Sequence, residues 1–304
     1  MKSIGFISDI NKSSISRKVP ELLLNIARLL FLSIVGYIVL YPLLYMLVYS
    51  VKDNAALLDM EHIWVPITYT FKNFSQAFEL MNFKVALKQT LVVQVLSAAI
   101  EVFVCAFVAY GFARFKFKGK PIFSFILILS LLIPIQMYSL SMSVNFRNLH
   151  IFSTPFVYWL PSLFGVGIRS GMMIFIYQQF FIGLPKELED AAYIDGAGPV
   201  KTYFKIALPS SSVVITTVAV LSFVWHWNEY YLATLCFLSD DAPLAMVMNF
   251  LGVYLQQIGI YKGWPEYATL VSAACLMYIV IPLVLYMIFQ RKFVRSIDRV
   301  GITG

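Results

Sequence analysis

Charged residues are scarce in this sequence. Asp, Glu, Lys and Arg make up 13% of its 304 residues, whereas 60% of the residues are hydrophobic. With so little charge and a mean hydropathy of +0.78, the chain is interpreted as an integral membrane protein. In lipid the backbone must satisfy its hydrogen bonds within helices or a closed barrel. The long unbroken apolar runs favour helices over the two-residue alternation of barrel strands.

Cysteine and histidine are also rare, with three of each, and neither is clustered. The absence of a C-x-x-C motif and of metal-ligand spacing speaks against a disulfide framework and a metal site. Basic and aromatic residues do not gather on one face, so the net charge of +7 gives no case for nucleic-acid binding. An intramembrane enzyme would need a paired nucleophile and base, and a channel would need a filter-like loop; neither is visible.

Six stretches that are nearly free of charge are predicted to cross a bilayer. A charge near the bilayer centre costs on the order of 3 kcal/mol on insertion scales, so charge-free stretches are the primary signal. Glu101 interrupts the second stretch, and Arg169 lies in the fourth with a proline and two glycines, which predicts a kinked or broken helix there. The predicted spans are residues 29–51, 89–113, 121–146, about 156–182, 206–238 and 267–290.

The basic residues are divided unequally between the two sides that six spans define. Of the 23 Lys and Arg residues, 16 lie in an N-terminal arm, the loop RFKFKGK, the segment after the fourth span and a C-terminal tail. Because cytoplasmic loops hold the excess of Lys and Arg, both termini are predicted to be cytoplasmic. The expected organisation is an arm at 1–28, a transmembrane domain at 29–290 and a tail at 291–304.

The polar segment LPKELEDAAYIDGAGPVKTYFKIALP, residues 184–209, stands between the fourth and fifth spans. A proline and three acids favour a helix start, and the run GAGP ends that helix at about residue 198, which predicts a helix-turn-helix elbow at the cytoplasmic face. An apolar stripe of Leu184, Leu188 and Ala191 or Ala192 offers a face on which another surface could dock; the alternative is a helix resting on lipid headgroups. The run GAGPVKT is not a phosphate-binding loop, because Asp195 and Val200 occupy its glycine positions.

The segment resembles the E-A-A-x3-G-x9-I-x-L-P signature of ABC importer permeases, with Asp190 in place of the usual Glu. The stretches AYGFARFKFKGK, LIPIQ and FVWHWNEYYLA resemble the carbohydrate-importing, maltose-type branch of that family. The resemblance covers most of the chain from the second span onward. It implies that the elbow is a coupling helix, which fits a groove on a separate ATPase. The residues implied in coupling are Glu187, Asp190, Ala191, Ala192, Gly196, Ile206, Leu208 and Pro209.

The resemblance also implies an assembly in a bacterial-type inner membrane. Its members would be a second homologous permease, two ATP-binding subunits, an extracytoplasmic solute-binding protein and a carbohydrate substrate. The partner ATPase would bind ATP, so no cofactor and no catalytic residue is expected in this chain. The loop 239–266 is either the surface that faces the binding protein or an ordinary surface loop with interfacial aromatics. A permease for a non-sugar solute is the main rival function.

The stretch WHWNEYY combines aromatic faces with amide and acid groups, which is the chemistry that holds sugars. The pathway candidates are therefore Trp227, Asn228 and Glu229, with Gln136 as a further polar group in a span. Against this, consecutive residues spread around a helix, and aromatics also form interfacial belts. Glu101 is a functional hypothesis by its depth, but a hydrogen-bonded role inside the bundle is favoured, and a pair with Arg169 is disfavoured.

Overall fold

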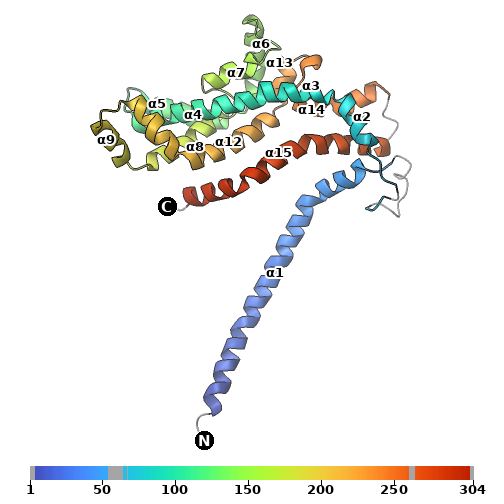
Figure 1. The fold of residues 1–304 in the computed structure, drawn as a ribbon, viewed down its shortest axis with the longest axis vertical. Helices are drawn as coiled ribbons and strands as arrows, with labels where there is room; N and C mark the ends of the chain where they lie inside the picture. Colours follow the sequence, from blue (N-terminus) through green and yellow to red (C-terminus); the bar gives the residue numbers. More distant parts are fainter. Residues whose placement is uncertain (1–3, 54–63, 67, 260–263, 302–304) are drawn as a thin grey trace.

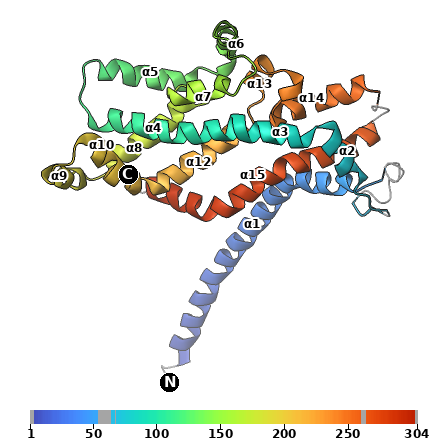
Figure 2. The ribbon, with the colours of Figure 1, turned by 45° about the horizontal axis from the view of Figure 1, so that its top comes forward.

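The structure is a computed structural model that describes residues 4–53, 64–66, 68–259 and 264–301 (Figure 1). Over these ranges the chain is built of helices, with one isolated bridge between Lys52 and Tyr69 and no strand. Most helices run side by side in a bundle, and the long helix α1 projects from it (Figures 1 and 2). The predicted all-helical fold is confirmed.

Three helices in the described part of the chain are long and apolar enough to cross a membrane. They lie within α1 (Ile4–Ser50), within the continuous helix Phe83–Arg114, and within α15 (Trp264–Gly301). The second comprises α3 (Phe83–Gln89), the π-helical turn η2 (Thr90–Val95) and α4 (Leu96–Arg114). A bent pair around residue 211 makes a fourth if it is counted as one span. The chain is thus a multi-pass membrane protein, and the number of six spans stays a prediction.

The predicted third span, 121–146, is not one helix. Helix α5 (Lys120–Leu132) ends at Ile133, whose backbone is extended with ψ of 112°. The short turn η3 (Ile135–Met137) follows, and α6 (Ser139–Asn148) then leaves in another direction (Figure 1). Pro134 explains the break, because a proline lacks the N–H of a helical bond and disfavours helical geometry in the residue before it.

The fourth predicted span is broken, as its sequence indicated. Helix α7 (Phe156–Leu163) and helix α8 (Ser170–Gly183) are separated by a turn in which Arg169 is left-handed, with φ of 57°. The fifth span, predicted as one stretch from 206 to 238, is also broken. It comprises α11 (Leu208–Ser210), α12 (Ser212–Trp227) and α13 (Tyr231–Cys236).

The boundaries expected at residues 28 and 290 fall inside α1 and α15, so they mark changes in composition and not the ends of helices. The connection after α1 contains α2 (Lys72–Leu80), and part of it, 54–63 and 67, lies outside the described residues. The predicted loop 239–266 is mostly a helix, α14 (Leu244–Gln257), and its residues 260–263 also lie outside them.

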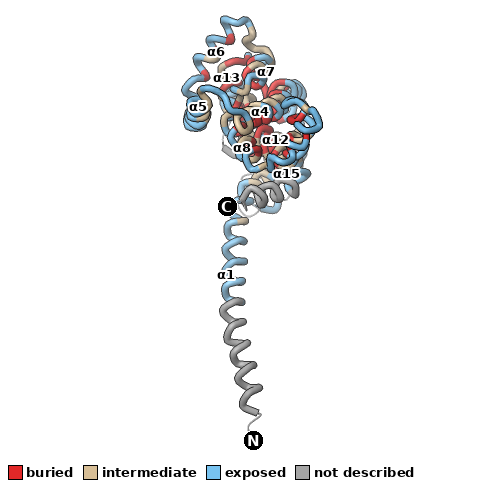
Figure 3. Tube along the Cα trace, turned by 90° about the vertical axis from the view of Figure 1, so that its left-hand side faces the viewer, coloured by how far each residue is buried: buried red, intermediate tan, exposed pale blue. Residues whose placement is uncertain are grey.

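The core is built around α4, which packs against α7, α8 and α12. Figure 3 shows the buried residues gathered in the bundle, while α1 is exposed over most of the part whose side chains are described and becomes buried only toward Ser50. Small residues of α4 let the neighbouring helices approach closely, as is common in membrane bundles. One cluster joins α4, α8 and α12 to the segment that follows α9; its members include Cys105, Ala106, Ala109, Met173, Tyr177, Phe181, Tyr203, Ala207 and Val218.

Candidate functional site

The polar segment 184–209 forms a helix-turn-helix elbow. Helix α9 (Glu187–Ile194) begins with acidic residues in its first turn, and a turn leads to α10 (Pro199–Thr202) and the π-helical turn η4 (Tyr203–Ala207). Gly196 ends α9 with φ of 77°, and the N–H of Ala197 donates to the carbonyl of Ala192 at 2.9 Å. This closure is the Schellman motif, for which glycine is suited because it has no Cβ. The predicted elbow is present.

The coupling candidates lie on two faces of this elbow. Ala192 is buried, as is Glu189, so this side of α9 faces the bundle. The outer side carries exposed residues, and its most exposed large apolar side chain is Ile194, at 87%. Glu187, Asp190, Ala191, Gly196 and Pro209 are exposed, whereas Ile206 and Leu208 are half-buried.

An ion pair that sequence reasoning missed joins the elbow to α4. The Nε of Arg114 lies 2.8 Å from Oε1 of Glu189, and each side chain is only 6% exposed. The Nη2 of Arg114 donates a second bond, of 2.6 Å, to the carbonyl of Leu184. Glu189 is followed three residues later by Ala192, which shares its helix face. Glu187 and Asp190 also have apolar residues three or four positions later, so no local signal marks Glu189 as the acid that turns inward.

The pathway candidates near the end of α12 are held in different ways. Trp227 is fully buried, and its ring lies 5.6 Å from that of Tyr278. Asn228 is exposed; its amide donates to the carbonyl of Val224 at 2.8 Å, and its Oδ1 accepts from the hydroxyl of Tyr278 at 3.3 Å. Gln136 is exposed in η3. Asn228 and Gln136 are therefore accessible from outside the chain, whereas Trp227 is enclosed by it.

Glu229 is engaged within the chain. Its carboxylate accepts from the hydroxyl of Tyr158 at 2.6 Å and from the backbone N–H groups of Leu232 at 3.0 Å and Ala233 at 3.4 Å. Its own carbonyl accepts from Gln94 at 2.6 Å. A carboxylate at the first N–H groups of a helix satisfies donors that have no partner within the helix. Glu229 thus caps α13 and binds it to α7.

Glu101 lies at a polar junction of three helices. Its carboxylate accepts from the hydroxyl of Ser170 on α8, and its Oε2 lies 3.4 Å from Nε2 of His226 on α12. The other ring nitrogen, Nδ1, lies 2.9 Å from the carbonyl of Ser222. A carbonyl can only accept, so Nδ1 carries a hydrogen. Arg169 is elsewhere, with its guanidinium 5.2 Å from the centre of the Trp225 ring.

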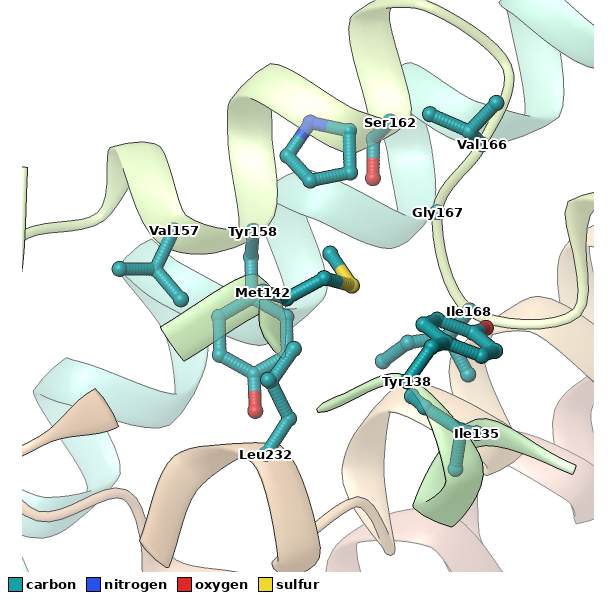
Figure 4. A pocket seen from close by; sticks show the side chains of 11 residues that line it. Ile135, Tyr138, Met142, Val157, Tyr158, Ser162, Val166, Gly167, Ile168 and Leu232 are labelled. Atoms are coloured by element: carbon teal, nitrogen blue, oxygen red, sulfur yellow. The ribbon is translucent and has the colours of Figure 1, made fainter. Parts of the chain in front are cut away.

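A small cavity of about 10 Å³ lies beside this junction, between α7, the turn before α8, η3 and α13 (Figure 4). Tyr138, Tyr158 and Ser162 line it together with Gly167. A Cβ at position 167 would lie 2.7 Å from Oγ of Ser162 and 2.8 Å from Oε1 of Glu101, so this glycine is required by close approach. The volume is about that of one water molecule and does not accommodate a sugar.

A helical membrane protein whose spans are interrupted by polar junctions, and which presents an exposed elbow between its fourth and fifth predicted spans, has the architecture of a transporter permease. Residues 102–299 match the family of binding-protein-dependent transport system inner membrane components, and the chain belongs to this family. It is therefore a permease component of ABC transporters and not an enzyme, as the resemblance implied.

Named relatives cover nearly the whole chain. A probable ABC transporter permease of Pyrococcus horikoshii is 30% identical over 86% of this chain and 91% of its own length. A sulfoquinovosyl glycerol transport system permease of Agrobacterium fabrum is 29% identical over 87% and 89%. In the crystal structure of a bacterial ABC transporter involved in alginate import, one chain superposes with a TM-score of 0.74 at 20% identity. The superposition covers 90% of this chain and 98% of that one, and establishes the fold.

Proposed function

We propose that this chain is one of two transmembrane permease subunits of an ATP-driven importer for a carbohydrate, an oligosaccharide or other glycoside. The observation that carries the proposal is the elbow, a short helix with small residues and with Glu187 and Asp190 exposed, in a family of ABC permeases. The relative named for sulfoquinovosyl glycerol supports a sugar-containing solute. An extracytoplasmic binding protein would deliver that solute to the pathway between the two permeases.

In this proposal α9 fits a groove on a separate ATPase that binds the ATP. The outer face of α9 supplies the contact: Asp190 and Glu187 offer charge, and Ala191 lets another backbone come close. Gly196 keeps the turn narrow. Ile206, Leu208 and Pro209 then carry the motion into α12, since Leu208 packs against the core cluster and the chain bends by 78° beside it. Tight packing transmits such rigid-body motion with little slack.

Replacing Asp190 with Asn tests the docking role. The residue is exposed and its carboxylate has no structural role in the described contacts, so the permease should fold normally but bind its ATPase about tenfold more weakly, which corresponds to about 1.4 kcal/mol. Pull-down of the ATPase that co-purifies with the tagged chain measures this. Glu79→Gln on α2 is the matched control, because it removes the same charge from an exposed helix elsewhere. Equal association of the Asp190→Asn and Glu79→Gln variants would refute the docking role.

The solute is tested by ATP hydrolysis in the reconstituted complex with its binding protein. Maltotriose and sulfoquinovosyl glycerol represent sugars, and glycerol 3-phosphate and a dipeptide represent other solutes. We expect stimulation by a sugar. Stimulation by a non-sugar alone would assign the chain to the rival permease class.

The sidedness of the membrane follows from the same proposal. The elbow, the basic loop after α4 and the end of α15 lie at one end of the bundle, and α2 and α14 lie at the other (Figures 1 and 2). With both termini cytoplasmic, a cysteine at exposed Lys118 should react with an impermeant maleimide only in inverted vesicles. A cysteine at exposed Lys72 should react only in right-side-out vesicles. The opposite pattern would reverse the orientation.

Among the pathway candidates, accessibility favours Asn228 and Gln136 as groups that touch solute. Glu229 and Trp227 are proposed to shape the pathway indirectly, by capping α13 and filling the core beside it. Alanine at position 228 or 136 should raise the KM for solute about tenfold, equivalent to about 1.4 kcal/mol, and leave basal ATP hydrolysis unchanged. An unchanged KM in both variants would remove them from the pathway.

A further inference from the structure

Helix α9 is joined to the spans along the chain only through short non-helical connections. At its start, α8 ends at Gly183 and Leu184 is extended, with ψ of 130°. At its end, the turn through Gly196 has φ of 77° before α10 begins. Such connections can change their backbone angles, so they transmit displacement less directly than a side-to-side contact does.

Arg114 provides a side-to-side contact between α9 and a span. It is the last residue of α4, and its guanidinium binds Glu189 on α9 and the carbonyl of Leu184 on the connection before it. The guanidinium is planar and its donors keep a fixed geometry, so two bonds from one group define an orientation as well as a distance. Because both side chains are 6% exposed, water and salt screen the pair weakly.

We propose that the Arg114–Glu189 pair is the direct mechanical joint between the coupling helix and the spans, so that α9 and α4 move as one body when the ATPase closes. This rests on the proposed coupling function of the elbow. Since α4 packs against α7, α8 and α12, a displacement delivered to its end reaches the centre of the bundle. Arg114 and Glu189 are positioning residues: they touch neither ATP nor solute and act through α4.

In this proposal the adjacent acids Glu189 and Asp190 have different functions. Glu189 is 4% exposed and is bound inside the chain, whereas Asp190 is exposed and available to another subunit. Loss of Glu189 should therefore leave the ATPase bound but disconnect its motion from the spans. Loss of Asp190 should weaken the binding itself. These two failures are measured separately.

The first test follows transport per ATP in the complex that co-purifies with the chain, using the solute that stimulates the wild type. Glu189→Gln should keep the ATPase bound and reduce solute moved per ATP about tenfold, within the range of coupling between distant sites. The double variant Arg114→Glu with Glu189→Arg should recover part of the loss, which a merely misfolded elbow would not. An unchanged ratio in Glu189→Gln, or loss of ATPase binding equal to that of Asp190→Asn, would overturn the joint.

The second test needs no solute. Spin labels at two exposed positions, Ile194 on α9 and Phe103 on α4, report the distance between the helices. In the wild type this distance should be the same with and without ATP and vanadate, and in Glu189→Gln it should change. A distance that changes equally in both proteins would refute the joint. A wild-type chain that binds no ATPase would instead refute the proposed function, whatever the labels report.

Discussion

The interior of the bundle and the elbow both contain carboxylates, but the two regions differ in whether those carboxylates have partners within the chain. Inside the bundle Glu101 and Glu229 each have partners from other helices. On α9 only Glu189 is bound in this way, and Asp190 remains exposed. Burying an acid in lipid without local partners costs free energy, so a buried acid binds other groups of the same fold. At the water-facing elbow an acid can stay free, and a free acid is available to another chain.

Replacing Glu101 with Ala should have the largest effect on stability. It removes the acceptor of the buried Ser170 hydroxyl and leaves a cavity among closely packed helices, and together these losses cost on the order of 3 kcal/mol. The thermal unfolding midpoint of the purified chain in nanodiscs measures the loss. Asp190→Ala is the control, since an exposed position should change stability by less than about 0.5 kcal/mol. Equal midpoints for the two variants would contradict the distinction between the regions.

Replacing Tyr158 with Phe removes the hydroxyl that donates to Glu229. A hydrogen bond to a charged group contributes about 2 kcal/mol, so the same unfolding assay should show a smaller loss than for Glu101→Ala. Tyr37→Phe on exposed α1 is a suitable control, because that hydroxyl is not enclosed by the bundle. If the two tyrosine variants lose equal stability, the bond to Glu229 is not what holds α13.

Gly167→Ala tests how closely the interior is packed. The new methyl would lie within 2.8 Å of the side chains of both Ser162 and Glu101, which must shift, and overpacking of this kind costs about 1.5 kcal/mol. Gly111→Ala on α4 is the matched control, because nothing lies within 4 Å of its added methyl. That variant should be neutral or more stable by about 0.5 kcal/mol. A neutral Gly167→Ala would mean that the junction has room to spare.

The smallest effect is expected in the elbow. Gly196 and Gly198 both have open space around them, but only Gly196 has a positive φ, of 77°. Gly196→Ala should disfavour the end of α9 by about 1 kcal/mol, and Gly198→Ala should not. Because α9 is a peripheral helix, hydrogen exchange of its amides is the sensitive measurement. Equal exchange in the two variants would show that the left-handed turn does not hold α9 in place.

The same contrast explains what the sequence could predict. The elbow was predicted correctly because its signals are local: acids at the start of the helix and Gly196 at its end. The break at Pro134 was also a local signal, but a search for charge-free stretches passes over proline. These features need no knowledge of the rest of the fold.

Other features depend on contacts between distant parts of the chain. The fifth span is interrupted where Glu229 caps α13, and that carboxylate is held by Tyr158, 71 residues away. Glu189 turns inward toward Arg114, which is 75 residues away, while its neighbour Asp190 turns outward. Residue type alone does not distinguish two adjacent acids, so the joint could not be found before the fold was known.

The hydrogen on Nδ1 of His226 has an electrical consequence. With Nδ1 bound to the Ser222 carbonyl, Nε2 and Oε2 of Glu101, which lie 3.4 Å apart, are the two positions left for one further proton. Whichever of the two atoms holds it, the pair has no net charge. A neutral acid beside a neutral ring has a total charge of zero, and so does a carboxylate beside an imidazolium. Moving one elementary charge through a membrane potential changes the energy by about 2.3 kcal/mol per 100 mV. With one proton at either position the junction has no net charge, so its place in the membrane adds no voltage dependence to transport.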